Sequence, residues 1–131
     1  MKIKKILITS AGVATAVNVI SSLKQSKKYK CIIISAGINK FSAGMMLADK
    51  QYIVPQVIKK NYLSSIIDII KREEIDFIFP LLSIENELFS SNKNLIEDLK
   101  CGILISDSKT SKICNNKLEF IRFLDRYNFS Y

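Results

Sequence analysis

The sequence predicts a three-layer α/β domain built around a mainly parallel, five-stranded sheet. Short isoleucine-rich runs recur along the 131 residues, and they are too continuous to alternate with polar residues. Parallel strands buried on both faces have this pattern. Segments with helical spacing of apolar residues separate the runs, and the links are short. Apolar residues make up 48% of the chain, which suffices for a core in one domain.

The elements follow one another in strand–helix order, as in a Rossmann-like domain. Asn61 and Ser83 precede two of the predicted helices and are expected to cap them with their side chains. Asn116 with Glu119 resembles a capping box. The predicted strands are 4–9, 30–35, 51–54, 76–79 and 102–106, and the predicted helices are 13–23, 63–70, 84–99 and 118–127, with a short helical turn at 45–47.

The turn after the first strand is the most informative stretch. It reads Ser10-Ala11-Gly12 and passes directly into a helix-periodic segment, which aims free N–H groups at one point where a phosphate or carboxylate binds well. A dinucleotide fingerprint requires three glycines here, yet only Gly12 matches, and no acidic residue ends the second strand. The pattern therefore disfavours NAD.

Two further segments hold candidate residues. Residues 42–55 combine small residues and methionines, which fits a crossover loop whose methionines fill the core. Residues 80–88 follow the fourth strand at the edge where open α/β sheets bind ligands. Glu85 and Glu87 lie in the first turn of the next helix; complementing its dipole is the favoured role for Glu85, and Glu87 is the better functional candidate.

Composition excludes several classes of protein. The net charge is +8, but scattered lysines among many isoleucines and asparagines indicate AT-rich codons and not a nucleic-acid surface. No apolar run approaches the roughly 20 residues of a membrane helix, and no signal peptide is visible. We therefore expect a cytoplasmic protein without nucleic-acid or membrane partners. With three cysteines and no histidine, disulfides and zinc are disfavoured, and buried or half-buried free thiols are expected.

Several landmarks in fixed order resemble the N-terminal, pre-ATP-grasp domain of proteins similar to the carbamoyl-phosphate synthase large subunit. This resemblance covers essentially the whole chain and implies a carboxylate–amine ligase that forms an acyl phosphate with Mg-ATP. The landmarks are Thr9-Ser10-Ala11-Gly12, Ser42-Ala43-Gly44 through Leu47-Ala48-Asp49-Lys50, Tyr52-Ile53-Val54-Pro55, Ile75-Asp76-Phe77-Ile78-Phe79-Pro80, Glu87-Leu88 and Cys114-Asn115-Asn116-Lys117.

By position, the resemblance implies a substrate-binding edge made by five residues: Ser10, Ala11, Gly12, Val13 and Glu87. It implies a small-molecule carboxylate or amine as substrate, with ATP and Mg bound by later lobes that this chain lacks. No catalytic or metal-binding residue is implied here. Ser35 stands where the family often has Asp, and Val13-Ala14 where it has a basic pair or a second Gly, so the contacts that the family's own side chains make at those positions do not carry over.

The predicted organisation is a pre-ATP-grasp domain over 1–115, followed by a helix and linker over 116–131 that lead toward a missing ATP-grasp domain. We expect the chain alone to be inactive. Apolar residues in the last helix, where missing lobes would pack, also allow a homodimer. The alternative is a stand-alone Rossmann-like nucleotide- or NAD-binding regulatory module, and the reading frame beyond Tyr131 distinguishes the two.

Overall fold

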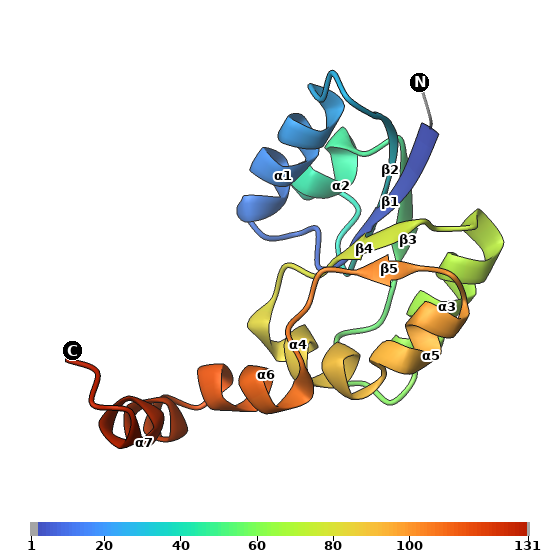
Figure 1. Ribbon diagram of the computed structural model, residues 1–131. Coiled ribbons are helices and arrows are strands. Elements are labelled where there is room, and N and C mark those ends of the chain that lie inside the picture. The colour runs from blue at the N-terminus through green and yellow to red at the C-terminus, as the bar shows by residue number, and fades with distance from the viewer. Residues whose placement is uncertain (1–2, 131) are drawn as a thin grey trace.

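The computed structural model describes residues 3–130, in which five strands form one sheet (Figure 1). The strands are β1 (Ile3–Ile8), β2 (Lys30–Gly37), β3 (Lys50–Ile53), β4 (Phe77–Phe79) and β5 (Gly102–Ile103). Their order is β3-β2-β1-β4-β5, and every neighbouring pair is parallel. The chain therefore steps outward from β1 to β3 and then crosses back to β4. This confirms the predicted Rossmann-like α/β class, in which helical crossovers connect parallel strands.

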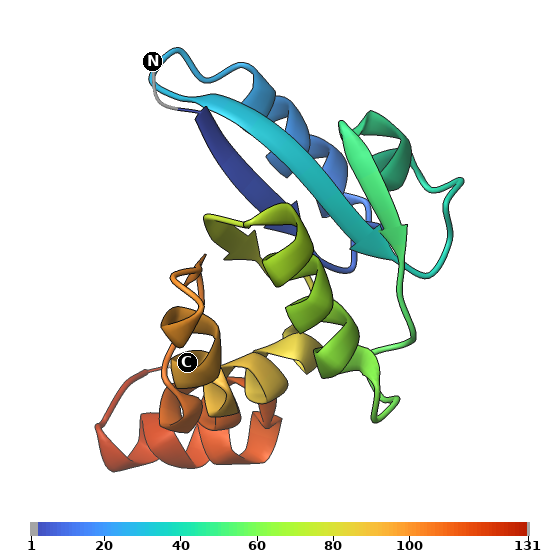
Figure 2. The ribbon, with the colours of Figure 1, turned by 90° about the vertical axis from the view of Figure 1, so that its right-hand side faces the viewer.

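Seven helices lie among the described residues, and they cover both faces of the sheet (Figure 2). The predicted helix over 84–99 is wrong, because two helices occupy it. The Asn92 carboxamide donates to the Leu88 carbonyl at 2.8 Å and ends the first of them. The helices are α1 (Thr15–Lys24), α2 (Ala43–Leu47), α3 (Tyr62–Glu73), α4 (Ser83–Ser91), α5 (Lys93–Asp98), α6 (Ser108–Asn115) and α7 (Lys117–Arg126).

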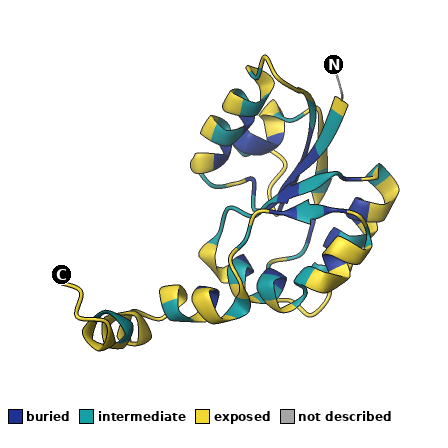
Figure 3. Cartoon of the chain, viewed as in Figure 1, coloured by how far each residue is buried: buried dark blue, intermediate teal, exposed yellow. Residues whose placement is uncertain are grey.

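The sheet separates two apolar clusters, and alternate residues of β1 point into one or the other. Ile6 and Ile8 join the cluster under α1 and α2, whereas Leu7 joins the larger cluster under α3, α4 and α5. The isoleucine-rich strand runs exist because both faces are covered. Buried residues accordingly concentrate along the central strands and the helix faces against them (Figure 3).

Two of the three predicted caps are wrong. No side-chain bond caps α3 from Asn61, whose carbonyl oxygen instead accepts from the hydroxyls of Ser64 and Ser65. Ser83 lies inside α4, and Leu82 is the capping position. The third cap is confirmed for Asn116, whose side chain accepts from the N–H groups of Leu118 and Glu119.

The chain ends in an arm made of α6 and α7 that leads away from the sheet (Figure 1). The sequence did not predict α6, which Asp107 caps by accepting from Thr110. No residue of α7 is buried. Cys101 is buried and Cys31 half-buried, as expected, but Cys114 is exposed because α6 buries only Ser111. Within residues 3–130, no helix has both the length and the apolar character to cross a membrane.

Candidate functional site

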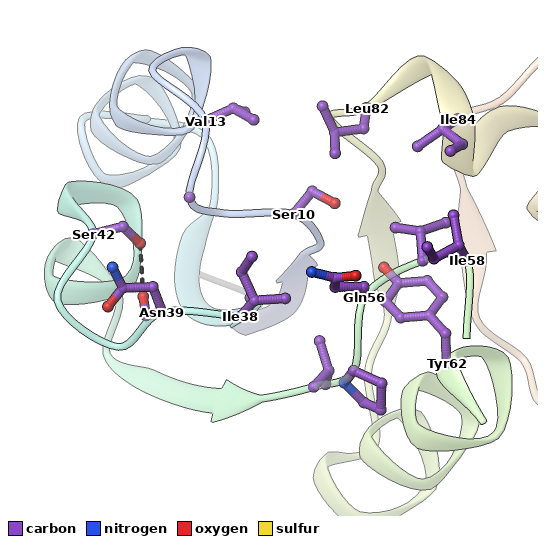
Figure 4. Close-up of a pocket in the computed structure, with 15 residues that line it drawn as sticks. Ser10, Val13, Ile38, Asn39, Ser42, Gln56, Ile58, Tyr62, Leu82 and Ile84 are labelled. Carbon is purple, nitrogen blue, oxygen red and sulfur yellow. Dashed lines mark hydrogen bonds between the residues drawn. The ribbon is translucent and has the colours of Figure 1, made fainter. Parts of the chain in front are cut away.

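A cavity of about 520 Å³ opens at the carboxyl edge of the sheet (Figure 4). The strand order reverses between β1 and β4, and the segments that follow both strands contribute to the wall. Ligands of open α/β sheets bind in this kind of crevice because the connections diverge there and leave space. The lining residues are Ser10, Gly12, Val13, Gly37, Ile38, Asn39, Ser42, Val54, Pro55, Gln56, Val57, Ile58, Tyr62, Leu82 and Ile84.

The turn after β1 forms the first wall. Ser10 adopts the left-handed conformation at φ 49°, whereas no described glycine has a positive φ, so the turn depends on Ser10 and not on Gly12. Ala11 then donates its N–H to the Ala36 carbonyl at 3.0 Å, which ties the turn to β2. The N–H groups of Gly12 and Ala14 have no hydrogen-bond partner within residues 3–130. These two amides remain available to an acceptor.

Close packing of α2 against this turn explains the small residues of the Ser42-Ala43-Gly44 landmark. A Cβ on Gly44 would lie 2.2 Å from the Ala11 carbonyl oxygen and 2.5 Å from the Ala16 Cβ. A Cβ on Gly12 would meet only the Ser42 side chain, at an ordinary 3.7 Å from its Oγ. Gly44 is therefore required by packing, whereas Gly12 leaves open space at the cavity wall.

On the opposite side of the cavity, a buried carboxylate accepts hydrogen bonds from two of the segments that form the wall. Glu85 is fully buried, and its Oε2 accepts from the N–H groups of Leu81 and Leu82 at 3.2 and 3.1 Å. Its Oε1 accepts from the hydroxyl of Tyr62, which comes from α3 and lines the cavity. Glu85 thus joins α3 to the link between β4 and α4, and it does more than complement a helix dipole.

The Tyr62 phenol stays protonated in this setting. Burial raises its pKa, and the neighbouring Glu85 carboxylate raises the pKa further. Thr9 is fully buried, and its Oγ1 makes no hydrogen bond. The wall at Tyr62 therefore presents a neutral aromatic ring whose hydroxyl is already committed to Glu85.

Of the five predicted substrate-binding residues, Ser10, Gly12 and Val13 line the cavity. Ala11 is fully buried and packs beneath the turn. Glu87 is exposed on α4 and is not among the lining residues, so its role stays a prediction. Because the helix turns by about 100° per residue, Glu85 and Glu87 point in different directions, and only Glu85 faces inward.

The sequence did not indicate the residues that contribute most of the wall. Ile38, Gln56, Ile58 and Tyr62 lie in loops or at a helix start, where periodicity carries no signal. The one available signal was their position directly after β2 and β3, since all carboxyl ends of a parallel sheet meet at one edge. Within residues 3–130, no group of three or more Cys, Asp or Glu side chains could hold a metal ion.

Comparison with known proteins identifies the family. The profile described as "PylC-like, N-terminal domain" matches residues 6–105, which contain the second half of β1, the whole of β2 to β5 and every described residue of the cavity wall. The chain belongs to this family. A search of curated proteins found no match.

Solved structures share the fold of this PylC-like domain. A complete multifunctional pyruvate carboxylase from Rhizobium etli superposes with a TM-score of 0.67 at 16% identity, over 98% of this chain and 13% of that one. The biotin carboxylase domain of a thermophilic 2-oxoglutarate carboxylase, bound to bicarbonate, gives a TM-score of 0.65 at 17% identity, over 94% of this chain and 28% of that one. The PylC-like domain thus corresponds to a small part of much longer carboxylase chains.

Proposed function

We propose that this chain is the substrate-binding N-terminal domain of an ATP-grasp carboxylate–amine ligase similar to the carbamoyl-phosphate synthase large subunit. The whole enzyme would form an acyl phosphate with Mg-ATP and transfer the acyl group to an amine. The observation that carries the proposal is the cavity at the strand-order reversal of a PylC-like domain, with Ser10, Gly12 and Val13 in its wall.

In this proposal, the turn after β1 receives the carboxylate of the small-molecule substrate. The free N–H groups of Gly12 and Ala14 lie at the start of α1, where the helix dipole favours an anion. The Ser10 hydroxyl at the cavity wall can donate a further hydrogen bond. These groups orient the substrate, and none of them performs the chemical step.

The composition of the cavity wall supports placing ATP and Mg elsewhere in the whole enzyme. No Lys, Arg, Asp or Glu is among the lining residues that the structure describes, so phosphates and a divalent cation would find no charged partner. We therefore assign both cofactors to the ATP-grasp lobes of the same polypeptide. The similarity to parts of much longer carboxylase chains supports this division.

The alternative, a stand-alone nucleotide- or NAD-binding module, has less support. Ile38 and Asn39 follow β2, where a dinucleotide site has an acidic residue for the ribose. Asn39 is also engaged within its own loop, because its Oδ1 accepts from the Phe41 N–H at 3.0 Å and its carbonyl accepts from Ser42.

The first test is the reading frame beyond residue 131. An ATP-grasp continuation supports the proposal, and an immediate stop codon favours the alternative. The resulting polypeptide is then assayed with Mg-ATP, hydroxylamine and each proteinogenic amino acid, because hydroxylamine traps an acyl phosphate as a hydroxamate. The 131-residue chain alone is the control, and Mg-dependent ATP turnover by that chain would contradict the proposal.

A substitution at Gly12 tests the assigned carboxylate position. Gly12→Asp places a negative charge beside the free amides and is expected to raise the KM for the trapped carboxylate about tenfold, with kcat little changed. Gly12→Ala is the matched control, since its Cβ meets Ser42 only at ordinary contact distance. An unchanged KM in Gly12→Asp would show that the substrate carboxylate does not bind at this turn.

A further inference from the structure

The interior of the cavity carries no ionised side chain. The chain has 20 Lys and Arg residues and 12 Asp and Glu residues, yet none is among the lining residues that the structure describes. Among the described lining residues, the one titratable group is the neutral Tyr62 phenol, which is already bonded to Glu85. An ionised ligand group placed inside would lose water without gaining a counter-charge, which is strongly unfavourable.

Exposed isoleucines surround the mouth of this cavity instead. Ile38, Ile58 and Ile84 are 62%, 72% and 53% exposed, and they come from three separate segments that follow β2, β3 and β4. Val54, Val57 and Leu82 continue the apolar wall inward. Separate loops that bring large apolar side chains to one concave site form a surface that gains from being covered.

The polar groups that remain available here are neutral. Gln56 is exposed, and its carboxamide lies between Ile38 and Tyr62 in the wall (Figure 4). A carboxamide offers both donors and an acceptor without charge. The volume of about 520 Å³ is that of a small-molecule site.

We propose that this cavity binds an uncharged, branched aliphatic or aromatic group, with Gln56 contacting a neutral polar edge of the ligand. The inference deepens the proposed function and rests on it only for the statement that the ligand is a substrate. The substrate carboxylate then stays at the Gly12–Ala14 rim, while its apolar side chain fills the space between Ile38, Ile58 and Ile84. The wall thus selects against substrates with a charged side chain.

The test uses the 131-residue chain labelled at its isoleucine δ-methyl groups and three probes of similar size. N-acetyl-L-leucinamide is neutral, N-acetyl-L-lysinamide is a cation, and the N-acetyl α-amide of L-aspartate is an anion. The leucine probe is expected to shift the methyl signals of Ile38, Ile58 and Ile84 with a Kd about tenfold below those of both charged probes.

Two variants make the result specific. Ile58→Lys introduces a cation at the mouth and is expected to weaken binding of the leucine probe about tenfold while strengthening that of the aspartate probe. Ile53→Lys is the control, because Ile53 is a 58% exposed isoleucine of β3 that does not line the cavity. That variant should bind the leucine probe as the unaltered chain does.

The outcomes separate the two proposals. A charged probe that shifts these three methyl signals as strongly as the leucine probe would contradict the neutral ligand class and leave the substrate-domain proposal standing. If no probe shifts them, the isoleucines are covered by something other than a small molecule, such as a further domain, and the inference is wrong. The hydroxamate assay judges the substrate-domain proposal independently of both results.

Discussion

Helices α3 and α7 are both amphipathic, but they have opposite surroundings. α3 buries Tyr62, Ile66, Ile69 and Ile70 against the sheet. α7 buries no residue, although it carries a comparable set of apolar side chains, of which Leu118, Phe120 and Ile121 are exposed. The difference teaches that helical periodicity predicts an apolar face, while only the path of the chain decides whether that face meets a partner.

The contrast extends to the charged residues near each helix. Glu85 is buried and joins α3 to the cavity wall through Tyr62. Glu119 of α7 pairs with Arg122 at 2.7 Å in solvent. A buried carboxylate with three donors should matter to stability, whereas an exposed i,i+3 pair should contribute little.

The largest difference in stability is expected between two isoleucine-to-alanine substitutions, one in α3 and one in α7. Ile66→Ala opens a cavity in the fully buried face of α3 and should lower the free energy of unfolding by about 4 kcal/mol. Ile121→Ala removes an exposed side chain of α7 and should change it by less than about 0.5 kcal/mol. Urea unfolding followed by circular dichroism measures both. Equal losses would show that α7 packs as α3 does.

A smaller loss of stability is expected when Glu85 is replaced. Glu85→Ala leaves the Tyr62 hydroxyl and the N–H groups of Leu81 and Leu82 without their acceptor, which should cost about 3 kcal/mol. Glu119→Ala, the matched control in α7, should cost less than about 0.5 kcal/mol. Thermal unfolding at neutral pH compares them. If Glu85→Ala were as stable as the unaltered chain, solvent would replace the carboxylate as a hydrogen-bond acceptor without loss of stability.

The smallest effect concerns the end of α3. Hydrogen bonds from Lys50 and Tyr52 lower the pKa of Glu73, with the Lys50 Nζ lying 2.5 Å from Glu73 Oε1. A lowered folded-state pKa gives stability that is present above the unfolded-state value of about 4.3 and is lost as pH falls through the folded-state pKa.

Glu73→Gln should therefore be less stable than the unaltered chain at pH 7, and the difference should shrink steadily on acidification below about pH 4. Urea midpoints measured across this range test it. A difference that stays constant with pH would show that the ionised carboxylate contributes nothing and that only the side-chain packing at Tyr52 matters.

Much of the fold could be predicted from the sequence because its signals are local. The Ile6–Ile8 and Ile33–Ile34 runs indicate strands buried on both faces, and each lies in a cluster core. The turn at Ser10–Val13 could also be predicted as a candidate site, because its small residues directly follow the first strand in the sequence. The capping expectation at Asn61 failed because its side chain makes no bond to the start of α3, and only its backbone carbonyl accepts from the Ser64 and Ser65 hydroxyls. The expectation at Ser83 failed because α4 begins at that residue, so that Leu82 is in the capping position.

The sequence by itself determined an α/β chain with parallel strands and a ligand edge beginning at Ser10, since strand runs, helix periods and a small-residue turn are encoded within a few neighbouring residues. Only the tertiary structure decided the strand order, the inward position of Glu85 and the ring of Ile38, Ile58 and Ile84 around a charge-free cavity. The physical reason is that these features depend on which distant segments meet, and no local pattern records that meeting.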